Sequence, residues 1–195
     1  MTNLVVVKLG GGLAQNPDKL AEAGLAVSGA ARHGRLVVVP GGGVFANTVR
    51  TVDRMLALPA TTAHWMAILG MDQSAHLIAA HTPDAVVVHD RMEIRAALDE
   101  SRIPVLAPYR WMVAADPLPH RWEVTSDSIA AFVAGALDAA LLVLLKPVSG
   151  PVAALVDPCF REVLPVGLRV AVVGAEELDR LVTVVRDRQE PATAG

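Results

Sequence analysis

Short apolar runs rich in valine recur along the chain, and a turn and a helical pattern follow most of them. Residues 4–7 and 36–39 both read LVVV, and residues 86–88 read VVV. Such runs are too short for free-standing helices. They lack polar alternation, which indicates strands buried on both faces, as in parallel sheets. Because strands and helices alternate, right-handed crossovers are expected. We therefore predict an α/β fold, a three-layer α/β/α sandwich with a mainly parallel sheet.

The predicted elements leave no obvious linker. Asn16 and Pro17 form a favourable helix start, and Thr125 precedes an apolar helical pattern. We predict a single domain over residues 1–188 and a frayed polar tail over residues 189–195. The predicted strands are residues 5–9, 35–39, 85–89, 104–107, 140–145, 152–156 and 170–173, and the predicted helices are about residues 17–32, 44–55, 62–80, 92–100, 126–137 and 176–186.

The composition argues against several classes of protein. The 195 residues are 53% hydrophobic, which is enough for a substantial core. The net charge of −3 gives no indication of a broad surface for binding nucleic acid. Gly135 and Asp138 interrupt the longest apolar stretch, residues 129–145, so we expect no membrane span and no membrane partner. No signal-peptide pattern opens the sequence, and we expect a cytoplasmic protein. The single cysteine, Cys159, indicates neither a disulfide nor a metal site.

Two predicted strands end in triple glycines, at Gly10, Gly11 and Gly12 and at Gly41, Gly42 and Gly43. Glycine leaves backbone N–H groups accessible, and N–H groups before a helix form an anion site. Neither triplet matches a Walker A loop or the dinucleotide fingerprint. Because ligands of parallel sheets bind beyond the carboxyl ends of the strands, the pair predicts a shared phosphate site. The alternative is that both are only tight turns.

Lysine is scarce in this chain, with three lysines against fourteen arginines. Lys8 and Lys146 stand at the ends of predicted strands. The Lys8 ammonium could reach a phosphate held by the following glycine turn. The alternatives are an edge lysine whose stem lies along the sheet for Lys8, and a surface lysine at a strand end for Lys146.

Three motifs resemble, in order, signatures of the amino acid kinase superfamily, which includes acetylglutamate, aspartate and uridylate kinases. They are Lys8-Leu9-Gly10-Gly11, Pro40-Gly41-Gly42-Gly43 and residues 125–131, TSDSIAA. The resemblance covers nearly the whole chain. Residues 63–73, 108–120 and 144–147 are similar to a short branch from archaea and methylotrophs. The resemblance implies an amino acid kinase-like fold with a trimmed C-terminal half. It also implies that the protein is a homo-oligomer.

The resemblance implies a kinase that uses ATP and Mg²⁺ and has no metal site of its own. Its chemistry is alignment and charge neutralisation around the moving phosphoryl group. Lys8 would contact that group, with N–H donors from Gly10, Gly11 and Gly12. Asp127 would fix the lysines, or is only a helix N-terminal acid. Lys146 would be a second cation near the nucleotide phosphates.

In the branch that the chain resembles, the acceptor is itself a phosphate monoester, an aminomethylfuran compound of methanofuran-type cofactor synthesis. Gly41, Gly42 and Gly43 would face it. Arg50 and Arg110 are candidates for its phosphate, since a guanidinium binds phosphate bidentately, or they are ordinary solvated arginines. Asp53 could pair with Arg50 or bind an acceptor amine, and His64 lines the acceptor pocket or simply packs. We treat the remaining histidines as structural.

The chain departs from the family pattern in three places. Gly12 stands where many members carry Ser or Thr, Lys146 and Pro147 replace the usual Thr-Asp, and 49 residues follow Lys146. These departures keep open a function of another class. The alternative is a non-catalytic protein that binds oxoanions or nucleotides, similar to the molybdenum storage proteins.

Overall fold

A computed structural model describes residues 3–187 and contains one six-stranded sheet, with all neighbouring strands parallel. The strand order is β3-β4-β2-β1-β5-β6. This confirms the predicted α/β class. The strands are β1 Val5–Leu9, β2 Leu36–Pro40, β3 Ala85–Val88, β4 Ile103–Leu106, β5 Leu141–Lys146 and β6 Arg169–Gly174.

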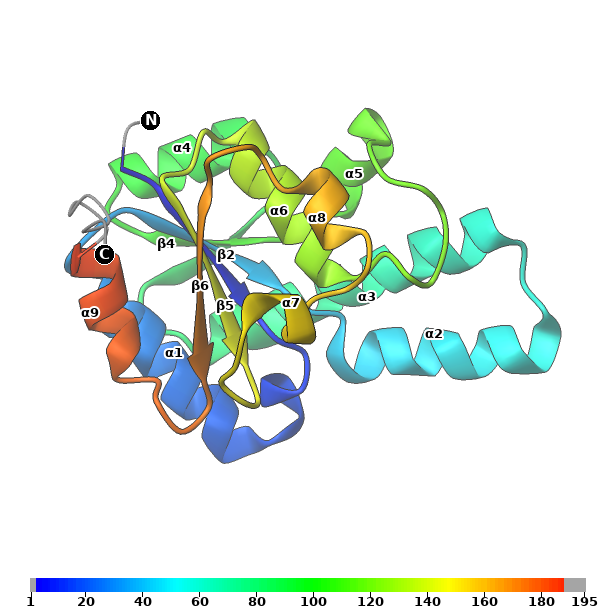
Figure 1. The fold of residues 1–195 in the computed structure, drawn as a ribbon, viewed down its shortest axis with the longest axis horizontal. Helices are drawn as coiled ribbons and strands as arrows, with labels where there is room; N and C mark the ends of the chain where they lie inside the picture. The colour runs from blue at the N-terminus through cyan, green and yellow to red at the C-terminus, as the bar shows by residue number, and fades with distance from the viewer. Residues whose placement is uncertain (1–2, 188–195) are drawn as a thin grey trace.

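Helices cover both faces of the sheet (Figure 1), and a separate hydrophobic core lies on each face. Side chains alternate between the faces, so Val5 and Val7 of β1 belong to one core and Val6 belongs to the other. The first core is closed by α1 Pro17–Ala31, α9 Arg180–Arg186 and the C-terminal half of α3 Ala60–Ala80; the second is closed by α4 Arg91–Asp99, α5 Tyr109–Ala115, α6 Ser126–Ala136 and α8 Phe160–Val163. The three predicted layers are therefore present.

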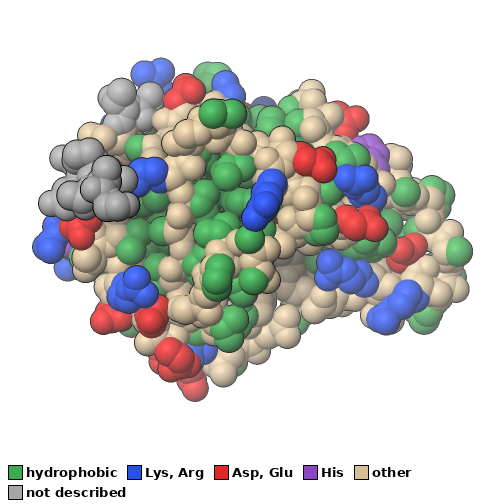
Figure 2. Space-filling model, in the orientation of Figure 1, with side chains coloured by type: hydrophobic (Ala, Val, Ile, Leu, Met, Phe, Trp, Pro, Cys, Tyr) green, Lys and Arg blue, Asp and Glu red, His purple; other side chains and the backbone are tan. Residues whose placement is uncertain are grey.

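An arm projects beyond the carboxyl ends of the strands (Figure 1). It consists of α2 Gly43–Leu56 and the N-terminal half of α3, which pack along each other. Arg50 and Arg54 of α2 are exposed. Figure 2 shows basic side chains gathered on this part of the molecule. The arm therefore adds a wall beside the strand ends, where ligands of parallel sheets bind.

Side-chain caps fix where several helices begin. The Asn16 carboxamide oxygen accepts hydrogen bonds from the N–H groups of Asp18 and Lys19 at 3.0 and 3.1 Å. Asp90 caps α4 in the same way, at 2.9 and 3.0 Å. Each cap satisfies backbone donors that a helix start leaves unpaired. Asn16 and Thr125, the two start signals predicted from the sequence, are the N-caps of α1 and of α6 Ser126–Ala136.

One predicted strand is wrong. Residues 152–156 form a helical turn, α7 Val152–Leu155, and not a strand. A short apolar run does not distinguish the two by itself, and β6 already occupies the sheet position beside β5. The sequence also missed the 3₁₀ turn η1 Leu13–Gln15 and the short helix α8.

The boundary of the predicted domain, residue 188, and the predicted tail lie outside the described residues, so both stay predictions. Within residues 3–187, no helix combines the length and the apolar character that a membrane crossing needs.

Candidate functional site

The two glycine turns meet because β1 and β2 are neighbours, with Leu9 opposite Pro40. A Cβ atom on Gly11 would lie 2.5 Å from the Gly43 nitrogen, and Gly43 has a φ of +54°. Only glycine allows both this approach and this backbone conformation. Within the described residues, the N–H groups of Gly11, Gly12 and Gly42 have no hydrogen-bond acceptor. They are free to bind an anion.

A cavity of about 240 Å³ opens beside these turns, and Gly11, Gly12, Gly42 and Gly43 form part of its lining. The arm contributes Asn47, Arg50 and His64, together with an apolar surface. That surface contains Ala60, Ala63, Ala67, Ile68 and Met71. The remaining wall includes Gln15, Arg121, Trp122, Val124, Thr125, Ser126 and Ile129. The cavity therefore combines anion-binding groups with an apolar side.

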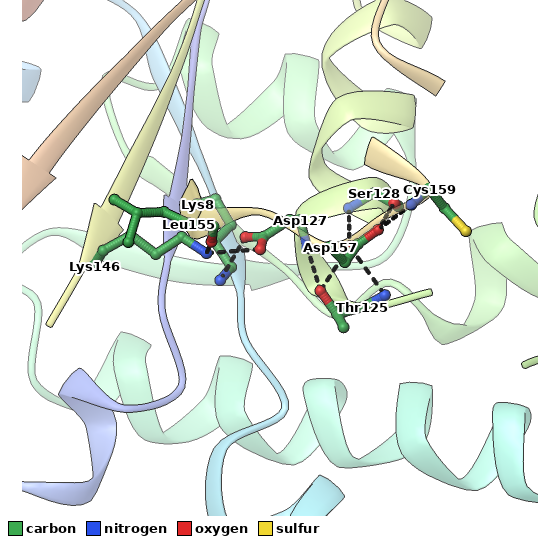
Figure 3. A network of polar contacts seen from close by, with 8 residues as sticks. All are labelled: Lys8, Thr125, Asp127, Ser128, Lys146, Leu155, Asp157 and Cys159. Carbon is green, nitrogen blue, oxygen red and sulfur yellow. Dashed lines mark hydrogen bonds and ion pairs between the residues drawn. The ribbon is translucent and has the colours of Figure 1, made fainter. Parts of the chain in front are cut away.

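A cluster of two ammoniums and one carboxylate lies at the ends of β1 and β5 (Figure 3). Lys8 Nζ is 2.9 Å from Asp127 Oδ1, and Lys146 Nζ is 2.6 Å from Asp127 Oδ2. The three side chains are 5%, 11% and 6% exposed for Lys8, Lys146 and Asp127 respectively. Neither lysine is a solvated surface residue, so both alternatives considered for them are wrong.

The secondary structure explains how these three groups meet. Lys8 alternates with Val7 and Leu9, so its side chain leaves the sheet on the side covered by α6. Asp127 lies in the first turn of α6, whose N-cap is Thr125. Lys146 ends β5 and also donates to the Leu155 carbonyl at 2.7 Å.

Burial lowers the pKa of the Lys8 ammonium, and Asp127 opposes that effect while Lys146 adds to it. Burial alone would raise the pKa of Asp127, but the two ammoniums outweigh it and hold that pKa below its ordinary value. Asp127 is therefore a carboxylate near neutral pH, with Oδ2 hydrogen-bonded to Lys146 and Oδ1 in an ion pair with Lys8. This suits a group that fixes two lysines and does not suit a general base.

Arg50 and His64, both predicted from the sequence, line the cavity. The Arg50 guanidinium lies 4.9 Å from the centre of the Trp122 ring and donates to the Asn47 side chain at 3.1 Å. The His64 ring stacks on His120 with centroids 4.3 Å apart. Burial, followed by the neighbouring His120, lowers the pKa of His64 to about 4, so His64 is neutral near pH 7.

Five predicted side chains do not line the cavity: Lys8, Asp53, Arg110, Asp127 and Lys146. Asp53 Oδ1 accepts from the Leu58 N–H at 2.9 Å, and Oδ2 accepts from Trp122 Nε1 at 2.7 Å. Asp53 thus supports Trp122, and no Arg50 pair forms. Arg110 has a 67% exposed side chain and lies 3.5 Å from Asp90 and 3.6 Å from Glu93. Gly10 and Gly41 are buried and do not line the cavity. Their N–H groups donate to the Leu145 and Leu9 carbonyls, so the prediction that Gly10 donates to a phosphate is wrong.

Sequence reasoning missed Arg121 and Trp122, which line the cavity. They lie in an irregular segment after α5, where no periodicity indicates which side chains face inward. Arg121 donates to the Cys159 sulfur at 3.0 Å. Neither Arg50 nor Arg121 forms an ion pair within residues 3–187, and the cavity lining there contains no Asp or Glu. The charge facing the cavity is therefore positive.

Protein side chains do not build a metal cage in the described part of the chain, since it contains no group of three or more His, Cys, Asp or Glu residues able to hold an ion. A catalytic Mg²⁺ would have to be held largely by phosphate oxygens, as is common for this ion.

Known proteins resemble this chain in both sequence and fold. A [5-(aminomethyl)furan-3-yl]methyl phosphate kinase from Methanocaldococcus jannaschii is 28% identical over 146 residues, which cover 74% of this chain and 66% of that protein. UMP kinase from Ureaplasma parvum superimposes with a TM-score of 0.65 at 12% identity, covering 97% of each chain. An isopentenyl phosphate kinase does so with a TM-score of 0.60 at 14% identity, covering 94% of this chain and 96% of the other.

The sequence signatures agree with this shared fold. Residues 3–150, which include both glycine turns, Lys8, Asp127 and Lys146, match the amino acid kinase family. The chain belongs to the amino acid kinase family.

Proposed function

We propose that this protein is a small-molecule kinase that transfers the γ-phosphoryl group of ATP to a phosphate monoester. The observation that carries the proposal is the unbalanced charge of the cavity. Arg50 and Arg121 face it together with free backbone N–H groups, and no described carboxylate lines it. Guanidinium groups that form no ion pair within the protein favour a dianionic ligand such as a phosphate.

The apolar wall of the cavity supports a compact acceptor body. Ala63, Ala67 and Met71 offer it packing surface and no charge. The M. jannaschii relative is named for such an acceptor, a furan carrying a methyl phosphate and an aminomethyl group. We propose the same compound, or a close analogue, as the substrate here, which would place the protein in methanofuran-type cofactor synthesis.

In the proposed reaction, an acceptor phosphate oxygen attacks the γ-phosphorus of ATP. A new P–O bond forms, the bond to the bridging oxygen breaks, and ADP leaves with that electron pair. Lys8 and the glycine N–H groups would stabilise the charge on the moving group, and Lys146 would neutralise charge on the nucleotide side. Mg²⁺ bound to the phosphates would add further charge neutralisation.

A second candidate is a protein that binds oxoanions or nucleotides without catalysis. It is favoured by Gly12, where family members often carry a hydroxyl. A Cβ atom at this position would lie 2.9 Å from Pro147 Cγ, so a serine would not fit without movement. Phosphoryl transfer would then have no hydroxyl donor at this position.

The test is ADP formation with ATP, Mg²⁺ and three acceptor classes: a carboxylate, an alcohol and a phosphate monoester. We expect turnover with the monoester. Arg50→Gln and Arg121→Gln should each raise the KM for the acceptor by roughly 10- to 100-fold, the range for a lost hydrogen bond to a charged group. Arg110→Gln, which removes an exposed arginine outside the cavity, is the matched control and should leave the KM unchanged.

Two results would contradict the proposal. Turnover with a carboxylate or alcohol but not with the monoester would assign the cavity to another acceptor. Tight binding of phosphate or nucleotide without turnover would favour the second candidate. The cytoplasmic location and the homo-oligomeric state stay predictions, and analytical ultracentrifugation of the full chain tests the latter.

A further inference from the structure

The buried carboxylate of Asp157 accepts five hydrogen bonds (Figure 3). Oδ2 accepts from the Thr125 N–H at 3.1 Å, the Thr125 hydroxyl at 2.7 Å and the Ser128 N–H at 3.1 Å. Oδ1 accepts from the Ser128 hydroxyl at 2.6 Å and the Cys159 N–H at 3.0 Å. Both oxygens are therefore filled by donors from two separate segments of the chain.

These contacts lie beside the cluster of Lys8, Asp127 and Lys146 and include none of its side chains (Figure 3). Thr125 and Ser128 bracket Asp127, the carboxylate that pairs with Lys8 and Lys146. Leu155, two residues before Asp157, supplies the carbonyl that accepts from Lys146 Nζ at 2.7 Å. A single side chain thus ties the start of α6 to the segment that holds Lys146 from its other side.

An ordinary helix cap does not explain this arrangement. Thr125 is already the N-cap of α6, and its hydroxyl accepts from the Asp127 N–H at 3.3 Å. A cap usually satisfies one or two donors of its own helix. Asp157 lies 29 residues beyond Ser128 and also binds the N–H of Cys159, so it links two distant segments.

We propose that Asp157 is a positioning residue, which sets Asp127 and the Leu155 carbonyl at the distances that align the Lys8 and Lys146 ammoniums. Its effect on turnover rests on the proposed kinase function. Its effect on the lysines does not, and can be measured without any substrate.

The three lysines of the chain make that measurement direct. Labelling lysine with ¹³C at Cε gives one signal each for Lys8, Lys146 and the partly exposed Lys19 of α1, which serves as an internal reference. Asp157→Asn turns an acceptor oxygen into a donor that faces other donors. We expect the Lys8 and Lys146 signals to move and the Lys19 signal to stay. The pKa of Lys8 should fall further, since a displaced Asp127 opposes burial less.

Kinetics provide the second readout. Asp157→Asn should lower kcat by roughly 10- to 100-fold, the cost of misplacing reacting groups by about 1 Å, and should change the acceptor KM less. Ser128→Ala removes one of the five hydrogen bonds and should cause smaller changes in the lysine signals and in kcat. If Asp157→Asn does not fold, Ser128→Ala serves as the test variant. Ile94→Val, a buried change in α4, is the control for a loss of stability alone.

Lysine signals that stay unchanged in both Asp157→Asn and Ser128→Ala would overturn the proposal, whatever happens to stability. The proposal would also be overturned if Ile94→Val moved the Lys8 and Lys146 signals as much as Asp157→Asn does. If the lysine signals move but the wild-type protein phosphorylates no acceptor, the positioning role stands and the proposed function fails.

Discussion

Replacing Asp127 with Asn should be among the most damaging single changes in this protein. The substitution keeps the size of the side chain and removes the only negative charge that Lys8 and Lys146 contact among the described residues. Two ammoniums then remain buried side by side. Removal of one partner of a buried ion pair costs about 3–5 kcal/mol. We expect the free energy of unfolding to fall by that amount and the Tm by about 6–20 °C.

The loss should also depend on pH. Burial already lowers the pKa of Lys8, and without Asp127 that pKa falls further. In the pH range between the folded and unfolded pKa values of Lys8, the unfolded chain binds more protons, so stability rises with pH. This rise is larger in the variant. The difference in the free energy of unfolding between wild type and variant should therefore become smaller as the pH increases from about 7 to about 9.5.

Urea unfolding followed by circular dichroism at both pH values measures these effects. The double variant Asp127→Asn with Lys8→Met removes one of the uncompensated charges. It should be more stable than Asp127→Asn alone by about 1 kcal/mol or more, a typical coupling between groups in contact. If the double variant is the less stable of the two, or if the difference between wild type and Asp127→Asn does not change with pH, the charge argument is refuted.

Three further predictions concern the cavity. Gly11→Ala should weaken phosphate binding measured by calorimetry and lower the free energy of unfolding by about 1–3 kcal/mol, because its Cβ would meet the backbone of Gly43. The control is Gly29→Ala in α1, whose Cβ would have its nearest contact at 3.6 Å and which should be tolerated. Equal effects of the two substitutions would contradict the close packing of the turns. Trp122→Phe loses the hydrogen bond to Asp53, so it should lower the free energy of unfolding by about 1 kcal/mol and raise the acceptor KM. An unchanged unfolding curve would argue against that hydrogen bond. The His64 signal in NMR titrations should show a pKa of about 4, so the folded state loses stability as the pH falls from about 6.5 toward that value; a pKa above about 6 would show that the ring is solvated.

The sequence predicted the elements whose signals are local. Valine-rich runs located β1 and β2, and the glycine triplets marked the strand ends where the cavity opens. The scarcity of lysine drew attention to Lys8 and Lys146. Their meeting with Asp127 was implied by family resemblance, and the structure shows it.

What the sequence could not give depends on long-range contacts. Arg110 lies in α5 and Arg121 in the irregular segment after it. Only the path of the chain turns Arg121 into the cavity and leaves Arg110 beside Asp90 and Glu93. The five hydrogen bonds to Asp157 come from three residues, and two of these, Thr125 and Ser128, lie about thirty positions away. Residues 152–156 are apolar enough for a strand, but β6 takes the place beside β5.

The most direct test of the proposed function is a ³¹P NMR spectrum of the reaction of ATP, Mg²⁺ and [5-(aminomethyl)furan-3-yl]methyl phosphate. Transfer to the acceptor phosphate joins two phosphorus atoms through oxygen. We therefore predict a new pair of coupled signals from a diphosphate monoester, growing as ADP appears. Lys8→Met, which keeps an unbranched stem and leaves Asp127 paired with Lys146, should slow their growth by roughly 10²–10³-fold with little change in KM. Absence of the coupled pair, or growth in the Lys8→Met variant at the wild-type rate, would contradict phosphoryl transfer at this site.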